Sequence, residues 1–295
     1  MEIEKKRLSG EVEKPVLTKE ARVILAGLKS VYESHVQLGD HGRQRVMVNQ
    51  FKDEALRADL KAEEEMVRAT REWAEEGGVK VKMRGEEVGE LEVGKGKKEY
   101  FMCLDGLDGS GNYLKENKKW GYGTMVALAE SNNPDYEDFE VAGIVMLNEG
   151  KVWLAEKGRG IYVFDIEREK WDKMRKFEVR GYEDNKILAD NYFKEAREYL
   201  SEKQKVWKRT GSMVASIVSI LKGERLGLAD VTRKGNLEQP VAYRLLKEMG
   251  GVVVDKEGED IGGKEFDSWG QEERVPVFIA SSEEIVDRMR EEVGF

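Results

Sequence analysis

Several residue types that common catalytic devices need are scarce in this chain. Its 295 residues include one cysteine, two histidines and four prolines. The single cysteine, Cys103, allows no internal disulfide and no cysteine zinc site, and its apolar neighbours indicate buried packing. The histidines, His35 and His41, lie near a predicted helix end at Gly39 and far along the sequence from the acidic motifs described below. Their position disfavours histidine phosphatase and catalytic-triad chemistry.

Long apolar runs and a targeting segment are also missing. Residues 1–7, Met-Glu-Ile-Glu-Lys-Lys-Arg, lack the apolar core of a signal peptide, and no run approaches the roughly 18 apolar residues of a membrane helix. We therefore expect a cytoplasmic protein with no membrane partner. The 59 acidic and 50 basic residues give a net charge of −9, which argues against nucleic acid as a general partner. Charged runs such as residues 62–65, Ala-Glu-Glu-Glu, are typical of solvated helix faces.

The most informative segment is residues 104–112, Leu-Asp-Gly-Leu-Asp-Gly-Ser-Gly-Asn, which follows the apolar run 100–103. Asp105 and Asp108 can bring two carboxylates to one hard cation. The backbone N–H groups of Gly109 and Ser110 can hold phosphate oxygens at the start of the element that follows. The segment therefore indicates metal-assisted phosphate chemistry.

Three other interpretations compete with a metal site when this segment is taken alone. Asp-Gly pairs also form ordinary solvated turns. A calcium loop of the EF-hand type fits poorly, because positions 3, 5 and 6 of a loop beginning at Asp105 would be Leu107, Gly109 and Ser110. An aspartyl-phosphate nucleophile ranks third, since no other feature of a phosphoaspartate enzyme accompanies it.

Two further acidic motifs favour the metal site. Residues 84–87, Arg-Gly-Glu-Glu, place Glu86 nineteen residues before Asp105, and Glu238 in the motif 236–240 lies twelve residues before Gly250. In order and spacing these motifs resemble the inositol monophosphatase and fructose-1,6-bisphosphatase superfamily. Residues 53–59, 151–160 and 211–215, the last reading Gly-Ser-Met-Val-Ala, extend the resemblance over most of the chain, from about residue 53 to the C-terminus.

The chain departs from the pattern of this superfamily at two positions. Gly106 replaces a proline, which is expected to loosen the backbone that presents the Leu107 carbonyl. Leu56 replaces a small polar residue. The segment 211–215, Ser110 and Glu238 favour the fructose-1,6-bisphosphatase branch, whereas the length of the chain and its first fifty residues leave open an inositol-phosphatase-like or other sugar phosphatase.

Apolar periodicity predicts an α/β (α+β) protein. Helices are expected at residues 18–38, from 53 or 59 to 76, and at 193–203, 212–222, 238–249 and 283–293. Strands are expected at residues 100–104, 124–129, 141–147, 152–155, 186–189, 252–254 and 277–280. The resemblance implies a layered αβαβα sandwich, one compact phosphatase unit with an N-terminal α+β lobe (1–178) carrying Glu86, Asp105 and Asp108 and a C-terminal α/β lobe (179–295) carrying Glu238.

The resemblance also implies a Mg²⁺-dependent phosphomonoesterase of the lithium-sensitive type, with two or three ions that Mn²⁺ could replace. All ligands would be oxygens, which suit hard cations; they are Glu86, Asp105, the Leu107 carbonyl, Asp108 and Glu238. Asp59, Ser110 and Glu86 would have catalytic roles, with Asp59 and Ser110 positioning or deprotonating the attacking water. Gly109 and Ser110 would bind the phosphate.

Substrate recognition is expected from Arg209, Arg233 and Lys234, because related segments of the superfamily contact the sugar or a second phosphate. Fructose 1,6-bisphosphate is the first expected substrate, and an inositol monophosphate or another small phosphate ester is the alternative. The resemblance implies a homodimer or homotetramer. A non-catalytic binding protein that keeps the fold is the hypothesis of a different class.

Overall fold

The fold is described from a computed structural model. The residues that it describes are 8–48, 54–115, 120–178, 180–190, 198, 201–202, 207–230, 237–270 and 275–294. In this part of the chain, no helix is long and apolar enough to cross a membrane.

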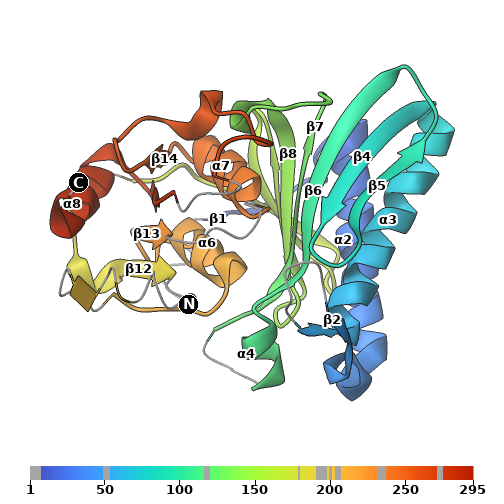
Figure 1. The fold of residues 1–295 in the computed structure, drawn as a ribbon, viewed down its shortest axis with the longest axis horizontal. Coiled ribbons are helices and arrows are strands. Elements are labelled where there is room, and N and C mark those ends of the chain that lie inside the picture. Colours follow the sequence, from blue (N-terminus) through green and yellow to red (C-terminus); the bar gives the residue numbers. More distant parts are fainter. Residues whose placement is uncertain are drawn as a thin grey trace.

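A large, mainly antiparallel sheet forms the centre of the molecule (Figure 1). Its strand order is β1-β11-β10-β9-β8-β7-β6-β4-β5, in which only β4 and β6 are paired in parallel. The strands are β1 (Leu8–Val12), β4 (Val79–Gly85), β5 (Gly89–Gly94), β6 (Lys98–Asp108), β7 (Gly123–Ala129), β8 (Phe139–Met146), β9 (Lys151–Glu156), β10 (Gly160–Asp165) and β11 (Lys170–Met174). A separate hairpin pairs β2 (Arg45–Val48) with β3 (Glu54–Leu56).

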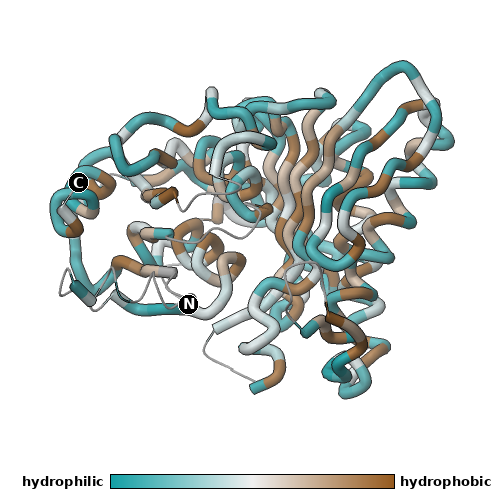
Figure 2. The backbone as a smooth tube through the Cα atoms, in the orientation of Figure 1, coloured by the Kyte–Doolittle hydropathy of each residue, from teal (hydrophilic) through white to brown (hydrophobic). Residues whose placement is uncertain are grey.

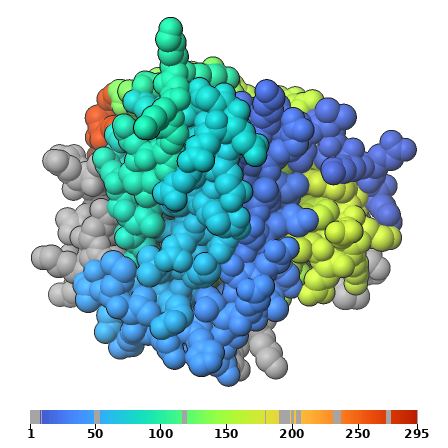
Figure 3. Space-filling model, turned by 90° about the vertical axis from the view of Figure 1, so that its right-hand side faces the viewer, coloured from blue at the N-terminus to red at the C-terminus, as the bar shows by residue number. Residues whose placement is uncertain are grey.

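Two long helices, α2 (Lys19–Leu38) and α3 (Arg57–Gly77), cover one face of the large sheet, and Figure 3 shows them side by side on that side of the molecule. Their apolar residues, including Ile24, Leu28 and Met66, pack against alternate residues of the strands. In Figure 2 the central strands are mostly hydrophobic and the outward sides of these helices are hydrophilic. Burial of this apolar surface holds the helical layer on the sheet.

The opposite face of the large sheet packs on α6 (Met213–Leu221) and α7 (Gln239–Glu248), which also contact a second, four-stranded sheet. This sheet has the order β12-β13-β15-β14, with β12 (Ile187–Asp190), β13 (Gly227–Asp230), β14 (Val252–Asp255) and β15 (Val277–Ala280). Helix α8 (Glu283–Val293) covers its outer face. The layers are therefore αβαβα, as the resemblance implied.

The predicted helices that the structure describes are confirmed, and local signals explain their ends. The Thr18 side chain accepts a hydrogen bond from the N–H of Ala21 at the start of α2, and Ser212 accepts one from Ala215 at the start of α6. Gly78 ends α3 with a left-handed backbone (φ 61°), a conformation that glycine adopts readily. The helix expected at residues 193–203 lies largely outside the described residues.

Every predicted strand is present, but sequence reasoning missed β1 to β5, β10, β11 and β13. The last strand of the large sheet ends at Met174, and the first strand of the four-stranded sheet begins at Ile187. The assignment of residues 1–178 and 179–295 to two lobes stays a prediction. The short 3-10 helices are η1 (Gly39–Arg43), η2 (Tyr136–Asp138), η3 (Asp184–Lys186) and η4 (Ile261–Gly263), and α4 (Ser110–Leu114) follows β6 directly.

Candidate active site

The parallel pair β4 and β6 brings the first two acidic motifs together. In the register of this pair Gly85 lies opposite Leu104, so Glu86 and Asp105 follow at the same edge of the sheet. Asp105 is buried, and its Oδ1 accepts the N–H of Leu107 at 3.0 Å. Residues nineteen apart in the sequence therefore become neighbours because both strands run in the same direction.

Asp108 lies at the last position of β6, after a shift in the register with β7 that begins beyond Asp105. Its Oδ2 accepts the N–H of Val214 at 2.7 Å and the hydroxyl of Ser212. Both donors belong to the N-terminus of α6, where unpaired N–H groups favour a negative charge. The segment 211–215, noted above for its resemblance alone, thus holds one of the two aspartates of the central motif.

The third acidic motif reaches the same site through α7. Glu238 is the residue that precedes the first turn of α7, and Pro240 occupies that turn, where its missing N–H costs nothing. The Cys103 thiol, fully buried as expected, donates to the carbonyl oxygen of Leu237 at 3.6 Å. This contact places Glu238 next to the strand that carries Asp105.

The charges of these acids act on one another. Burial raises the pKa of Asp105 well above its usual range, and the negative charges of Glu86, Asp108, Glu238 and Asp59 raise it further. Burial likewise raises the pKa of Glu238, together with the charges of Asp230 and Asp108. The structure therefore gathers all five predicted acids into one region, where they repel each other unless protons or a cation neutralise them.

Asp59 and Ser110, the two residues expected to position or deprotonate the attacking water, are hydrogen-bonded to each other. The Ser110 hydroxyl lies 3.2 Å from Oδ1 of Asp59 and 3.0 Å from the carbonyl oxygen of Leu107. The other oxygen of Asp59 accepts the N–H of Leu56 at 2.6 Å at the start of α3. Burial raises the pKa of Asp59 to about 7, although the bond from Leu56 opposes this effect, and the charges of Glu87 and Glu86 add to it.

Glycines at the end of β6 allow close contacts with neighbouring elements. Gly109 has a left-handed backbone (φ 86°), and a Cβ atom there would lie 2.8 Å from Cβ of Ser212. It precedes the first turn of α4, and its carbonyl oxygen accepts the N–H groups of Asn112 at 2.8 Å and Tyr113 at 3.1 Å. The N–H groups of Ser110 and Gly111 belong to the first turn, where a helix offers no acceptor of its own. This geometry suits the predicted phosphate-binding role of Gly109 and Ser110.

Gly106 is not the loose point that the sequence led us to expect. Its carbonyl oxygen accepts the hydroxyl of Thr124 at 2.6 Å. A Cβ atom at this position would lie 2.5 Å from the backbone oxygen of Asp59 and 2.8 Å from Cγ of Glu63. The absence of a side chain therefore lets α3 approach β6 closely, and the strand remains hydrogen-bonded around the Leu107 carbonyl.

The chemistry of the acidic side chains and their arrangement decide whether they fit a metal ion. The donors are all oxygens in a region of concentrated negative charge, which a hard divalent cation would neutralise. Within the described residues, however, no three acidic, histidine or cysteine side chains already surround one point closely enough to hold an ion. One oxygen of Asp105 and one of Asp108 accept protein donors. The donor set therefore fits Mg²⁺ in its chemistry, although the described side chains are not assembled around one ion.

A family model for the inositol monophosphatase family matches residues 14–291. The chain belongs to this family. Members of the family are generally Mg²⁺-dependent, and membership indicates a phosphoric monoester hydrolase.

Individual relatives are distant. A bifunctional NADP phosphatase/NAD kinase of Methanococcus maripaludis is 23% identical over 187 residues, which cover 60% of this chain and 33% of that protein. The match thus spans about a third of the length of this relative. Among solved structures, the suhB protein of Bartonella henselae is 18% identical with a TM-score of 0.71, covering 94% of this chain and 99% of its own. The inositol monophosphatase of Thermotoga maritima is 15% identical with a TM-score of 0.69, covering 94% and 97%.

The predicted substrate residues are only partly described. Arg209 is half-buried and lies between Lys208, whose carbonyl oxygen accepts the N–H of Ala189, and Thr210, whose carbonyl oxygen accepts the side-chain amide of Asn112. Since Asn112 belongs to α4, this segment lies beside the predicted phosphate-binding turn. Arg233 and Lys234 fall outside the described residues.

Sequence reasoning missed Glu63, which it had placed in a solvated run, and this expectation is wrong because the side chain is fully buried. Both of its oxygens accept peptide N–H groups of residues 86–88. Burial raises the pKa of Glu63, whereas the hydrogen bonds from these N–H groups, which both carboxyl oxygens accept, favour the ionised form. The signal that could have identified Glu63 is its position four residues after Asp59, which places both side chains on the same face of the helix.

Proposed function

We propose that this member of the inositol monophosphatase family is a Mg²⁺-dependent phosphomonoesterase that hydrolyses a small sugar phosphate, with fructose 1,6-bisphosphate as the first candidate. The observation that supports the proposal best is the gathering of four acids, Glu86, Asp108, Glu238 and Asp59, around Asp105, with the Ser110 hydroxyl hydrogen-bonded to Asp59. A binding protein without turnover would not need a buried acid and hydroxyl beside the negative cluster.

In this mechanism the chain holds the ester and prepares the proton transfer. The N–H groups after Gly109 would bind the phosphate oxygens at the start of α4. The Ser110 hydroxyl would orient the attacking water and pass its proton to Asp59. Burial, the largest cause of the raised pKa of Asp59, makes this carboxylate a stronger base than an exposed aspartate and suits it to accept a proton.

Bound Mg²⁺ would polarise the phosphate and lower the pKa of the attacking water. We propose that Glu86, Asp105, the Leu107 carbonyl, Asp108 and Glu238 hold these ions. Mn²⁺, which accepts the same oxygen ligands, would replace Mg²⁺.

A bisphosphate needs a second cationic group, and Arg209, in the segment tied to α4, is the described candidate. Solved structures with this fold include inositol monophosphatases and a fructose-1,6-bisphosphatase of Leishmania major. The Methanococcus relative is named a bifunctional NADP phosphatase/NAD kinase. An inositol phosphate and NADP are therefore the alternative substrates, and a homodimer or homotetramer is the proposed assembly.

The proposal is tested by phosphate release from fructose 1,6-bisphosphate, inositol 1-phosphate and NADP, each with Mg²⁺ present. Asp105→Asn is the inactive control, because it keeps the shape of the side chain and removes a charge that the ion requires. We expect release from at least one ester by the unmodified protein and almost none by the variant. No release from any ester, or equal release by Asp105→Asn, would contradict the proposal.

Arg209→Ala then tests the substrate class. If the second phosphate is bound there, the variant should lose far more activity on fructose 1,6-bisphosphate than on inositol 1-phosphate. Equal losses on both esters would assign Arg209 a role in the fold alone. A clear preference of the unmodified protein for inositol 1-phosphate or NADP would replace the bisphosphate as substrate.

A further inference from the structure

The turn after β4, which carries Glu86, is held by a side chain from a different element. Glu63 on α3 accepts three consecutive peptide N–H groups through its two carboxyl oxygens. Oε1 accepts Glu86 at 2.8 Å and Glu87 at 3.1 Å, and Oε2 accepts Glu87 at 3.1 Å and Val88 at 2.7 Å. The carboxylate thus fixes the backbone direction of the turn at the residue that presents the Glu86 side chain.

Two glycines make room for this carboxylate. A Cβ atom on Gly85 would lie 2.5 Å from Oε2 of Glu63, and one on Gly106 would lie 2.8 Å from its Cγ. Gly85 ends β4 and Gly106 separates Asp105 from Leu107 in β6. The side chain of Glu63 is therefore enclosed between the ends of the two strands that deliver the predicted ligands Glu86 and Asp105.

We propose that Glu63 is a positioning residue for the metal site. The inference rests on the proposed function. The Glu63 carboxylate holds the backbone of residues 86–88 so that the Glu86 side chain is oriented to bind the metal ion. It touches neither ion nor substrate and acts through the three peptide groups. Partners that orient metal ligands in this way typically change metal affinity 10- to 100-fold when they are removed.

Glu63→Gln is the sharpest perturbation of this contact. The amide matches the carboxylate in size, but its NH₂ group must face a peptide N–H, because both carboxyl oxygens accept such groups. At least one of the hydrogen bonds to residues 86–88 is then lost, and a donor is placed against a donor. The volume enclosed by Gly85 and Gly106 stays filled.

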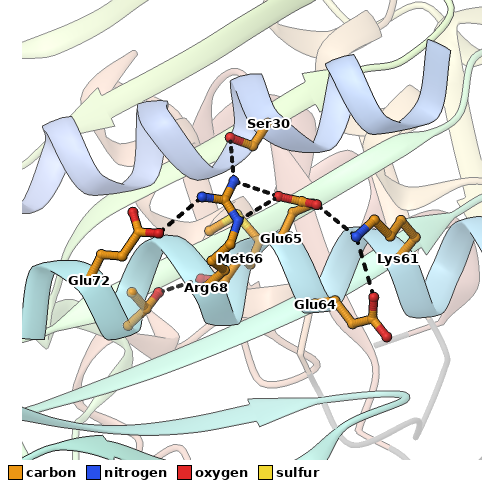
Figure 4. Close-up of polar contacts among 8 residues, drawn as sticks. Ser30, Lys61, Glu64, Glu65, Met66, Arg68 and Glu72 are labelled. Carbon is orange, nitrogen blue, oxygen red and sulfur yellow. Dashed lines mark hydrogen bonds and ion pairs between the residues drawn. The ribbon is translucent and has the colours of Figure 1, made fainter. Parts of the chain in front are cut away.

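The matched control is Glu65→Gln, two residues along the same helix. Glu65 is also nearly buried, but it pairs with Lys61 at 2.9 Å and Arg68 at 2.6 Å on the side of α3 that faces α2 (Figure 4). Its loss therefore disturbs α3 to a similar extent without touching the Glu86 turn.

The readout is direct binding of Mn²⁺ to the full chain, followed by electron paramagnetic resonance of the free ion. We expect Glu63→Gln to weaken Mn²⁺ binding at least tenfold, and Glu65→Gln to leave it within about twofold of the unmodified protein. Equal Mn²⁺ affinity of the unmodified protein and Glu63→Gln would overturn the inference. A loss of the same size in Glu65→Gln would also overturn it, because the effect would then come from helix stability.

Failure of the proposed function gives a different result: the unmodified protein would release no phosphate from any ester, whatever the Mn²⁺ affinities of the two variants. If Glu63→Gln does not fold, hydrogen exchange in the unmodified, metal-free protein still tests the contact. The amides of residues 86–88 should exchange as slowly as those of β4. Exchange at the rate of an exposed loop would overturn the inference.

Discussion

The buried acids predict that, without metal, this protein is less stable at neutral pH than at acidic pH. The pKa of Asp59 is 3.8 in an exposed chain and about 7 in the fold, chiefly because the side chain is buried. Between these values the folded state binds the proton more tightly, so the free energy of unfolding falls as pH rises through this window. Since one pKa unit corresponds to 1.36 kcal/mol, Asp59 alone accounts for about 4 kcal/mol.

This loss can be isolated with Asp59→Asn, which removes the titrating group and keeps its size. Urea unfolding in a chelator, measured from pH 4 to pH 8 for both proteins, gives the difference in free energy of unfolding at each pH. We expect the unmodified protein to lose about 3 kcal/mol relative to the variant between pH 4 and 7, the part of the total that falls in this range. A constant difference over this range would refute the assignment of a raised pKa to Asp59.

Mg²⁺ should reverse the trend, because a cation bound to the folded state neutralises the same charges. At a concentration one hundred times its dissociation constant, a ligand adds about 2.7 kcal/mol to the free energy of unfolding. We expect this gain at pH 7 to 8 and much less of it at pH 4, where protons compete for Asp105, Glu238 and Asp59, whose pKa values are raised. An equal gain at both ends would show that Mg²⁺ binds elsewhere.

Two further predictions concern the end of β6. Ser110→Ala should lower turnover by about 10²-fold, with a smaller change in KM, because it removes the hydroxyl next to Asp59. Steady-state kinetics measure both constants. Unchanged turnover would show that Ser110 and Asp59 do not act on the attacking water. Gly106→Ala should cost about 1 to 3 kcal/mol in urea unfolding, since its Cβ would meet the backbone of Asp59, while Gly111→Ala, where no atom lies within 4 Å, should not pay this steric cost. Equal costs in the two variants would contradict the close approach of α3 to β6.

The sequence was sufficient to find the acids that follow local signals. Asp105 and Asp108 end a strongly apolar strand, and Glu238 begins a helix with Pro240 in its first turn. That these acids lie close together could be predicted only from the resemblance. The contacts that bring them together, the parallel pairing of β4 with β6 and the contact of Cys103 with Leu237, join segments far apart in the chain. No local pattern encodes these contacts.

Other features were missed for physical reasons that the structure makes clear. Residues 79–85 alternate apolar and charged side chains, the pattern of a half-buried strand, and a search for that period alone would have found β4. Glu63 was misplaced because a charged helical run is normally solvated, whereas here peptide N–H groups take the place of water. The pairing of β1 with β11, which joins Leu8 to Met174, has no local signal.

In the proposed mechanism, carboxylates of this site bind a divalent cation that hydrolysis requires. The most direct test is phosphate release from fructose 1,6-bisphosphate and inositol 1-phosphate by one preparation, first in a chelator and then after addition of Mg²⁺ or Mn²⁺. We expect no release in the chelator and full recovery with either metal. Full activity in the chelator would contradict it.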